Sequence, residues 1–167
     1  MRCRDRMFSF DSAYPLWEYA GSIQDLLISY KIGGNRRLAA FFAGRVKDVL
    51  DDLHPGIPVV PVPFRRSKFR KAGWDQVEDI VRILERRGTA AVRCLERGEG
   101  ASQKTLDYSA RMSNLSGRIR PRPGSRVPER VVLLDDVLTT GATLSECARI
   151  LRTGGARRVD AVVLAAD

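Results

Sequence analysis

Apolar runs of strand length alternate with amphipathic segments along most of the chain. The runs expected to form strands are residues 58–63, 89–95, 131–136 and 159–166. Apolar residues recur at helical spacing, before and between these runs, in residues 23–30, 38–53, 77–84 and 144–151. Strands that alternate with helices predict an α/β fold, with a mainly parallel sheet flanked by helices on both faces.

The N-terminal part is less regular. Residues 8–10 and 16–19 are predicted to form two short extended pieces with a turn at Tyr14–Pro15 between them. A helix is expected after them, with Ser22 as its N-cap. We interpret residues 1–55 as a small N-terminal hood and residues 56–167 as the core, both within one domain.

The stretch 131–143 carries the clearest candidate chemistry. Its apolar run ends in the adjacent carboxylates Asp135 and Asp136, and a loop of small and hydroxylated residues leads into a helix. The start of a helix offers unpaired N–H groups and partial positive charge to a phosphate. Carboxylates beside such a loop suit sugar hydroxyls or a divalent cation. The pattern therefore predicts a site for a ribose 5-phosphate.

The same stretch resembles the phosphoribosyl pyrophosphate (PRPP) binding motif of type I phosphoribosyltransferases, and more narrowly the ComF (competence protein F) family. Tyr30 and Lys31 with the following glycine-rich turn fit that family, as do Arg70, Gly73, Trp74 and Gln76. The resemblance implies a type I phosphoribosyltransferase fold whose PRPP site lies at the carboxyl ends of the strands. It also implies a four-cysteine zinc module before this region, which is missing here, so no zinc is expected.

The resemblance assigns roles to residues by position. Asp135 and Asp136 would be catalytic, holding the ribose hydroxyls, and would bind Mg²⁺ directly or indirectly. The loop for the 5-phosphate would be Val137, Leu138, Thr139, Thr140, Gly141, Ala142 and Thr143. The basic loop after residues 58–63 would bind pyrophosphate through Arg65, Lys68 and Arg70, and a flexible loop would contribute Gln103, Lys104 and Arg111.

Two positions depart from the family pattern in the pyrophosphate region. Ala72 stands where arginine is usual, and Asp75 stands where asparagine is usual. The first change removes a positive charge and the second adds a negative one, and both are expected to weaken pyrophosphate binding.

Composition narrows the environment and the partners. The chain has 29 Lys and Arg against 20 Asp and Glu, a net charge of +9, which suits polyanions such as PRPP or nucleic acid. We expect a cytoplasmic protein, because no apolar run approaches the length of a membrane span and no signal peptide is visible. Cys94 and Cys147 are predicted to be core residues, and His54 to sit in a helix-ending turn.

The function implied by the resemblance is transfer of ribose 5-phosphate from PRPP to a nitrogenous, base-like acceptor, with Mg²⁺ as cofactor and release of pyrophosphate. The aromatic residues Tyr14, Trp17 and Tyr19 do not identify the acceptor. Two alternatives remain open: a non-catalytic PRPP-binding protein, and an accessory protein of DNA uptake. A homodimer is compatible with each of them.

Overall fold

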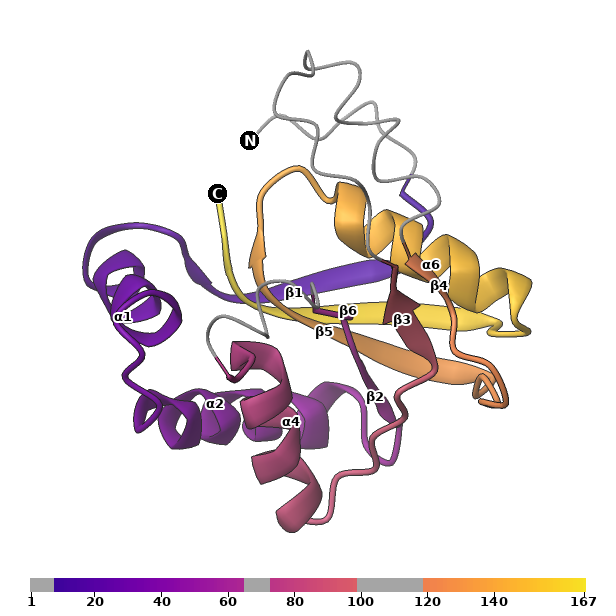
Figure 1. Cartoon of the computed structure of the whole chain (residues 1–167), viewed down its shortest axis with the longest axis horizontal. Coiled ribbons are helices and arrows are strands. Elements are labelled where there is room, and N and C mark those ends of the chain that lie inside the picture. Colours follow the sequence, from indigo (N-terminus) through magenta and orange to yellow (C-terminus); the bar gives the residue numbers. More distant parts are fainter. Residues whose placement is uncertain (1–7, 65–72, 99–118) are drawn as a thin grey trace.

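A four-stranded parallel sheet forms the centre of the computed structural model, which describes residues 8–64, 73–98 and 119–167 (Figure 1). The strand order is β1-β6-β5-β2, and every neighbouring pair is parallel. The strands are β1 (Ser12–Glu18), β2 (Val59–Pro61), β5 (Arg130–Leu138) and β6 (Arg158–Ala166). A separate antiparallel pair consists of β3 (Leu95–Arg97) and β4 (Ile119–Pro121).

Helices cover both faces of the sheet, as the alternating pattern predicts. On one face lie α1 (Gly21–Lys31), α2 (Leu38–Leu53) and α4 (Gln76–Arg86), and on the other lies α6 (Ala142–Thr153) (Figure 1). Strand β5 shows why: Val132 and Leu134 pack against α2 and α4, whereas Val131 and Leu133 pack against α6. Successive side chains of a strand point to opposite faces, so the apolar run serves two cores. The observed architecture is therefore the predicted α/β fold, a parallel sheet flanked by helices on both faces.

The first strand corrects the prediction of a turn at Tyr14–Pro15. Strand β1 runs without interruption through both residues, and Pro15 is opposite Val163 of β6. Proline is tolerated because β1 is an edge strand. An edge strand has a neighbour on one side only, so a residue without an N–H can be placed there without losing a hydrogen bond between strands. Residues 8–10 lie outside any strand, so the first extended piece is also wrong.

Two further local predictions fail. Helix α1 begins at Gly21 after Ala20, with no side-chain cap, so Ser22 is not the N-cap. The run 89–95 joins the sheet only briefly: the Val59 N–H donates to Ala90, and the Val92 N–H donates to Val59. The chain then leaves the sheet edge and pairs with β4 instead. Such a switch of partner depends on tertiary contacts and leaves no mark in the hydrophobic pattern.

Other expectations hold. Strand β2 is short and buried despite its prolines, Cys94 and Cys147 are buried in the core, and His54 ends α2. Helix α6 stops at Gly154 and Gly155, where Gly155 has a φ of 108°. In the ranges that the structure describes, no helix is long and apolar enough to cross a membrane.

Helix α1 lies beyond the carboxyl ends of β5 and β6 (Figure 1). It is tied to the core through Tyr30, which is fully buried and donates its hydroxyl to the Gln76 carbonyl at 2.7 Å. Arg36, in the turn after α1, reaches α4 through a two-pronged ion pair with Asp79, with N–O distances of 2.7 and 2.9 Å. The N-terminal helix is therefore fixed where the central strands end.

Candidate functional site

The turn between β5 and α6 is built as a tight strand-to-helix connection. Strand β5 continues two residues past the acidic pair, because Val137 and Leu138 still pair with β6. The loop is therefore shorter than predicted and consists of residues 139–141. Gly141 precedes the helix with a φ of 72°, in the left-handed region that favours glycine. An added Cβ there would lie 2.6 Å from the Phe8 ring, so any larger residue would have to displace that ring.

The two carboxylates of the acidic pair have different surroundings. Asp136 is buried, and its Oδ2 accepts hydrogen bonds from the Lys31 ammonium and, at 2.7 Å, from Gln76 Nε2. Its Oδ1 accepts from the Val137 N–H at 2.8 Å. Asp135 Oδ1 accepts from the Asp136 N–H at 2.9 Å. Neighbouring residues of a strand point to opposite sides, so Asp136 faces α1 and α4 while Asp135 does not.

These surroundings shift the two pKa values in opposite directions. Burial works to raise the pKa of Asp136, but the charge of Lys31 and the hydrogen bonds from Lys31, Gln76 and the Val137 amide outweigh it and lower that pKa. Burial also raises the pKa of Asp135, and the negative charge of Asp136 raises it further. One negative charge of the pair is thus held firmly at Asp136.

The start of α4 completes this side of the site. Asp75 is the N-cap of α4, and its carboxylate accepts from the N–H groups of Val77 at 3.0 Å and Glu78 at 3.1 Å. Asp and Asn are both strong N-caps, so the departure at Asp75 keeps the local function of the usual residue. The cap starts the helix at Gln76, and this places the Gln76 amide against Asp136.

A cavity of about 210 Å³ brings these groups together. It is lined by residues from α1, the segment after β2, the start of α4, β3, β5 and α6: Lys31, Val62, Pro63, Phe64, Asp75, Gln76, Val77, Arg97, Asp135, Asp136, Val137 and Thr143. Among the predicted loop residues, Val137 and Thr143 line it, and Thr139 and Thr140 are exposed.

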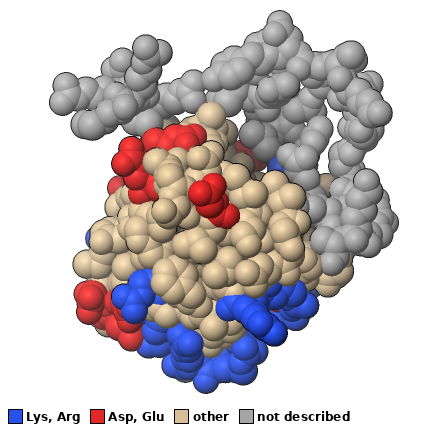
Figure 2. Space-filling model, turned by 90° about the vertical axis from the view of Figure 1, so that its left-hand side faces the viewer, with Lys and Arg blue, Asp and Glu red and all other residues tan. Residues whose placement is uncertain are grey.

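On the side of the molecule that carries α1, Asp and Glu gather mainly in the upper part of the view and Lys and Arg in the lower part (Figure 2).

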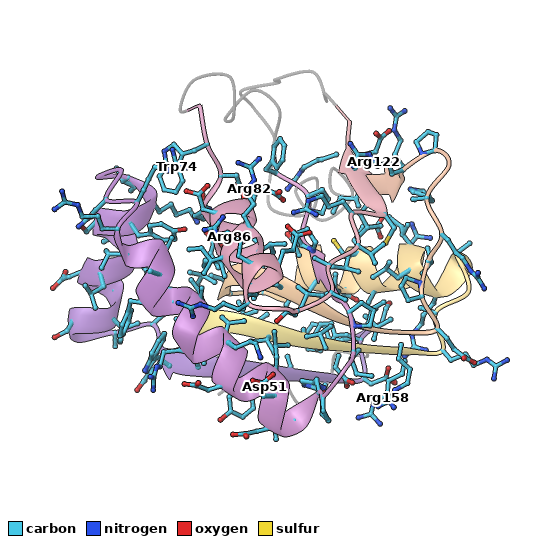
Figure 3. All side chains as sticks on the ribbon, turned by 90° about the horizontal axis from the view of Figure 1, so that it is seen from below. Asp51, Trp74, Arg82, Arg86, Arg122 and Arg158 are labelled. Atoms are coloured by element: carbon cyan, nitrogen blue, oxygen red, sulfur yellow. The ribbon has the colours of Figure 1, made fainter. Side chains whose placement is uncertain are left out.

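A second cavity, of about 260 Å³, adjoins the first along residues 62–64 and Asp75. Its far wall includes Arg82 of α4 and Arg122, which follows β4 (Figure 3). Its carboxylates already have partners: Glu78 pairs with Arg93 at 2.8 Å, Glu96 pairs with Arg120 at 2.6 Å, and Asp75 caps α4. We therefore assign it no ligand.

Several predicted site residues lie outside the described part of the chain. They are Arg65, Lys68 and Arg70 for pyrophosphate, and Gln103, Lys104 and Arg111 of the flexible loop. Conversely, Lys31 and Gln76 have a role at the acidic pair that the sequence reasoning missed. The only signal for them in the sequence is that both fit the family pattern.

The acidic pair is poorly suited to hold Mg²⁺ by itself. The oxygens of Asp136 already accept three hydrogen bonds, one of them from an ammonium group. Among the described residues there is no group of three or more His, Cys, Asp or Glu side chains that could hold a metal ion. Asp136 therefore has little capacity left for direct coordination of Mg²⁺, and binding of Mg²⁺ through water, which the resemblance also allows, stays a prediction.

Comparisons with known proteins agree with this picture. Residues 96–167 match the phosphoribosyl transferase domain model. Competence protein ComFC of Streptococcus pneumoniae (strain ATCC BAA-255 / R6) is 26% identical over 147 residues, which is 86% of this chain and 63% of that protein.

Two solved structures are also similar to the chain. The allosteric regulatory enzyme of purine biosynthesis is 17% identical, with a TM-score of 0.49 over 75% of this chain and 25% of that one. A hypoxanthine phosphoribosyltransferase from Trypanosoma cruzi is 18% identical, with a TM-score of 0.43 over 77% of this chain and 65% of that one. The chain spans less than two thirds of the length of ComFC and of each of these two proteins.

The parallel sheet, the acidic pair before the helix and the match over residues 96–167 converge on one assignment. The fold is that of the type I phosphoribosyltransferases, residues 96–167 match the phosphoribosyl transferase domain, and the chain is similar to the ComF protein ComFC.

Proposed function

We propose that this chain binds PRPP and transfers its ribose 5-phosphate to a nitrogenous acceptor, releasing pyrophosphate. One observation carries the proposal: the acidic pair and the start of α6 lie at the same end of β5, with Asp135, Asp136 and Thr143 lining one cavity. A carboxylate suits sugar hydroxyls, and a helix N-terminus suits a phosphate. Together they match the two ends of a ribose 5-phosphate.

Each group has a separate part in the proposed reaction. Asp136, held ionised by Lys31, would accept a hydrogen bond from one ribose hydroxyl and stabilise positive charge on the ribose ring. Asp135 would accept a hydrogen bond from the neighbouring ribose hydroxyl. The 5-phosphate would be bound by the hydroxyl and N–H groups of Thr139, Thr140, Gly141, Ala142 and Thr143. The leaving pyrophosphate would meet Arg65, Lys68 and Arg70, and the loop with Gln103, Lys104 and Arg111 would exclude water.

The chemistry requires positioning and electrostatics more than a strong base. The bond from the anomeric carbon to the pyrophosphate oxygen breaks, and its electron pair leaves with the pyrophosphate. The acceptor nitrogen then supplies the electron pair of the new bond and loses its proton to the released pyrophosphate or to water. Cationic character on the ring rises in between, and a fixed carboxylate nearby lowers the energy of that state.

A turnover assay tests the proposal. The protein is incubated with PRPP and a panel of nucleobases, and released pyrophosphate is measured. We expect release that depends on one class of base and that falls by about a hundredfold or more in Asp136→Asn, because a charged partner of the transition state is lost. PRPP binding without release for any base would favour the non-catalytic PRPP-binding alternative.

A second candidate function is nucleic-acid handling. An open groove of about 1100 Å³ lies at the amino ends of β5 and β6, opposite the acidic pair. Arg122 and Arg126 line it, and both are exposed. Arg157, also in its wall, is partly neutralised by Glu129 at 2.8 Å. The similar ComFC protein is named for competence, and we propose DNA as the polyanion for this surface.

The groove is tested with a fluorescent single-stranded oligonucleotide and anisotropy at several salt concentrations. Replacing both Arg122 and Arg126 with alanine should weaken binding and flatten its salt dependence, because fewer counterions are released. Arg45→Ala, an exposed arginine paired with Asp48 on α2, is the control. Equal affinity in the groove variant and the control would count against this surface.

A further inference from the structure

The side chain of Lys31 reaches across the molecule to the acidic pair. It projects from the end of α1, and its ammonium contacts Asp136 Oδ2, 105 residues away in sequence. The Lys31 side chain is 38% exposed and the Asp136 side chain 12% exposed, so the ion pair lies where the cavity opens to solvent. The site therefore contains a cation that belongs to the chain itself.

We propose that Lys31 takes the place that a divalent metal would otherwise have at Asp136, so that the ribose end of the ligand binds without metal. Lys31 is thus a positioning residue that acts through Asp136. The proposal rests on the proposed function only in naming ribose hydroxyls as the ligands of the acidic pair. It departs from the family expectation that Asp135 and Asp136 bind Mg²⁺.

The hydrogen bonds of Asp136 give the first argument. Its Oδ1 accepts from the Val137 N–H at 2.8 Å, and its Oδ2 accepts from Gln76 Nε2 at 2.7 Å and from Lys31. A carboxylate has about four acceptor positions, so about one remains. That one suffices for a hydroxyl. It could give a Mg²⁺ ion only a single contact, and the ion would be repelled by the ammonium that already binds Oδ2 of the same carboxylate.

The anchoring of Lys31 gives the second argument. The preceding residue, Tyr30, is fully buried and donates its hydroxyl to the Gln76 carbonyl. Gln76 in turn donates its side-chain amide to Asp136. Lys31, Gln76 and Asp136 are thus held by one connected set of contacts, and the position of the ammonium is set by the fold. A preorganised charge of this kind needs no ion from solution.

The first experiment titrates Mn²⁺ alone into the protein and follows the free ion by electron paramagnetic resonance. The wild type should show no Asp136-dependent binding. Lys31→Met should bind Mn²⁺ at least about tenfold more tightly, because an unpaired carboxylate is exposed, and the added change Asp136→Asn should abolish this gain. Binding by the wild type that Asp136→Asn removes would overturn the proposal, as would an unchanged affinity in Lys31→Met.

The second experiment measures the affinity for ribose 5-phosphate in EDTA and in Mg²⁺. The wild type should bind equally in both. Lys31→Met should lose about tenfold or more in EDTA, as expected for losing a hydrogen bond to a charged group, and should recover part of it in Mg²⁺. Lys31→Arg should retain binding in EDTA. Wild-type affinity that requires Mg²⁺, or no recovery in Lys31→Met, would contradict the proposal.

The matched control is Lys47→Met, which breaks another lysine–aspartate pair, Lys47 with Asp51 on α2. It should change neither readout. Inorganic pyrophosphate serves as a second ligand, since a folding defect in Lys31→Met would weaken its binding too, whereas a positioning role leaves it unchanged. If the wild type fails to bind ribose 5-phosphate, the proposed function fails, and the Mn²⁺ titration still decides the role of Lys31.

Discussion

Replacing Gly141 with alanine should destabilise the chain more than the same change at Gly34. Both glycines have a left-handed backbone, with φ values of 72° and 69°. Alanine in that region costs about 1–2 kcal/mol at either position. The two differ in their surroundings: an added Cβ meets nothing within 4 Å at Gly34, but lies 2.6 Å from Phe8 Cε1 and 3.0 Å from Phe8 Cζ at Gly141.

Phe8 cannot move away without loss. Its ring stacks on Phe10 with the centroids 4.8 Å apart. The Ser9 N–H donates to Ser145 Oγ at 3.0 Å, and the Ser9 carbonyl accepts from Arg152 Nε at 2.7 Å, so the segment is fastened to α6. Forcing a group into such packing typically costs about 1–3 kcal/mol.

We therefore expect the free energy of unfolding to fall by about 1–2 kcal/mol more in Gly141→Ala than in Gly34→Ala. For a domain of this size that is an extra drop in Tm of about 2–8 °C. Urea denaturation followed by circular dichroism measures the difference, and adding Phe8→Ala should remove it. Equal destabilisation by the two glycine substitutions, or an excess that persists without the Phe8 ring, would refute the reasoning.

Three other substitutions test separate parts of the structure by the same denaturation assay. Asp75→Ala should cost about 1 kcal/mol because α4 loses its N-cap, whereas Asp75→Asn should be nearly neutral; equal losses would argue against capping. Tyr30→Phe should cost about 1 kcal/mol because the hydroxyl bond to the Gln76 carbonyl is lost; no change in unfolding would argue against that bond. Asp160 is buried, which works to raise its pKa, but hydrogen bonds from Arg158 and Ser12 outweigh burial and lower it below 3.8. The advantage of the wild type over Asp160→Asn should therefore be present above about pH 4 and shrink as the pH falls below it; an advantage that grows on acidification would contradict the assignment.

The sequence was sufficient wherever the pattern is local. The apolar run before Asp135, the glycines after residue 153 and the last strand each follow from neighbouring residues, and the structure has them as predicted. The acidic pair and the helix start were likewise found from sequence order alone, because a strand, a turn and a helix place them at one point.

Contacts between distant segments could not be read in this way. Lys31 contacts Asp136 only because α1 lies beyond the carboxyl ends of the central strands. No pattern in residues 21–31 predicts Asp136 as the partner. Pro15 was expected to break a strand, but β1 is the sheet edge, and this depends on the order in which strands from both ends of the chain assemble. From the sequence, Asp75 is only an added negative charge that opposes pyrophosphate binding. Its capping role depends on the N–H groups of Val77 and Glu78, which only the structure shows.

Isothermal titration of PRPP with Mg²⁺ tests the central claim, that PRPP binds at the acidic pair and the start of α6. The wild type is compared with Asp135→Asn/Asp136→Asn and with the control Asp48→Asn/Asp51→Asn. The control makes the same two kinds of substitution on the surface of α2, where the two side chains are 59% and 60% exposed. We expect the wild type and the control to bind alike and the site variant to bind about a hundredfold more weakly, from the loss of the charged acceptor at Asp136 and of a second acceptor at Asp135. Undetectable binding by the folded wild type, or equal binding by all three proteins, would contradict the claim.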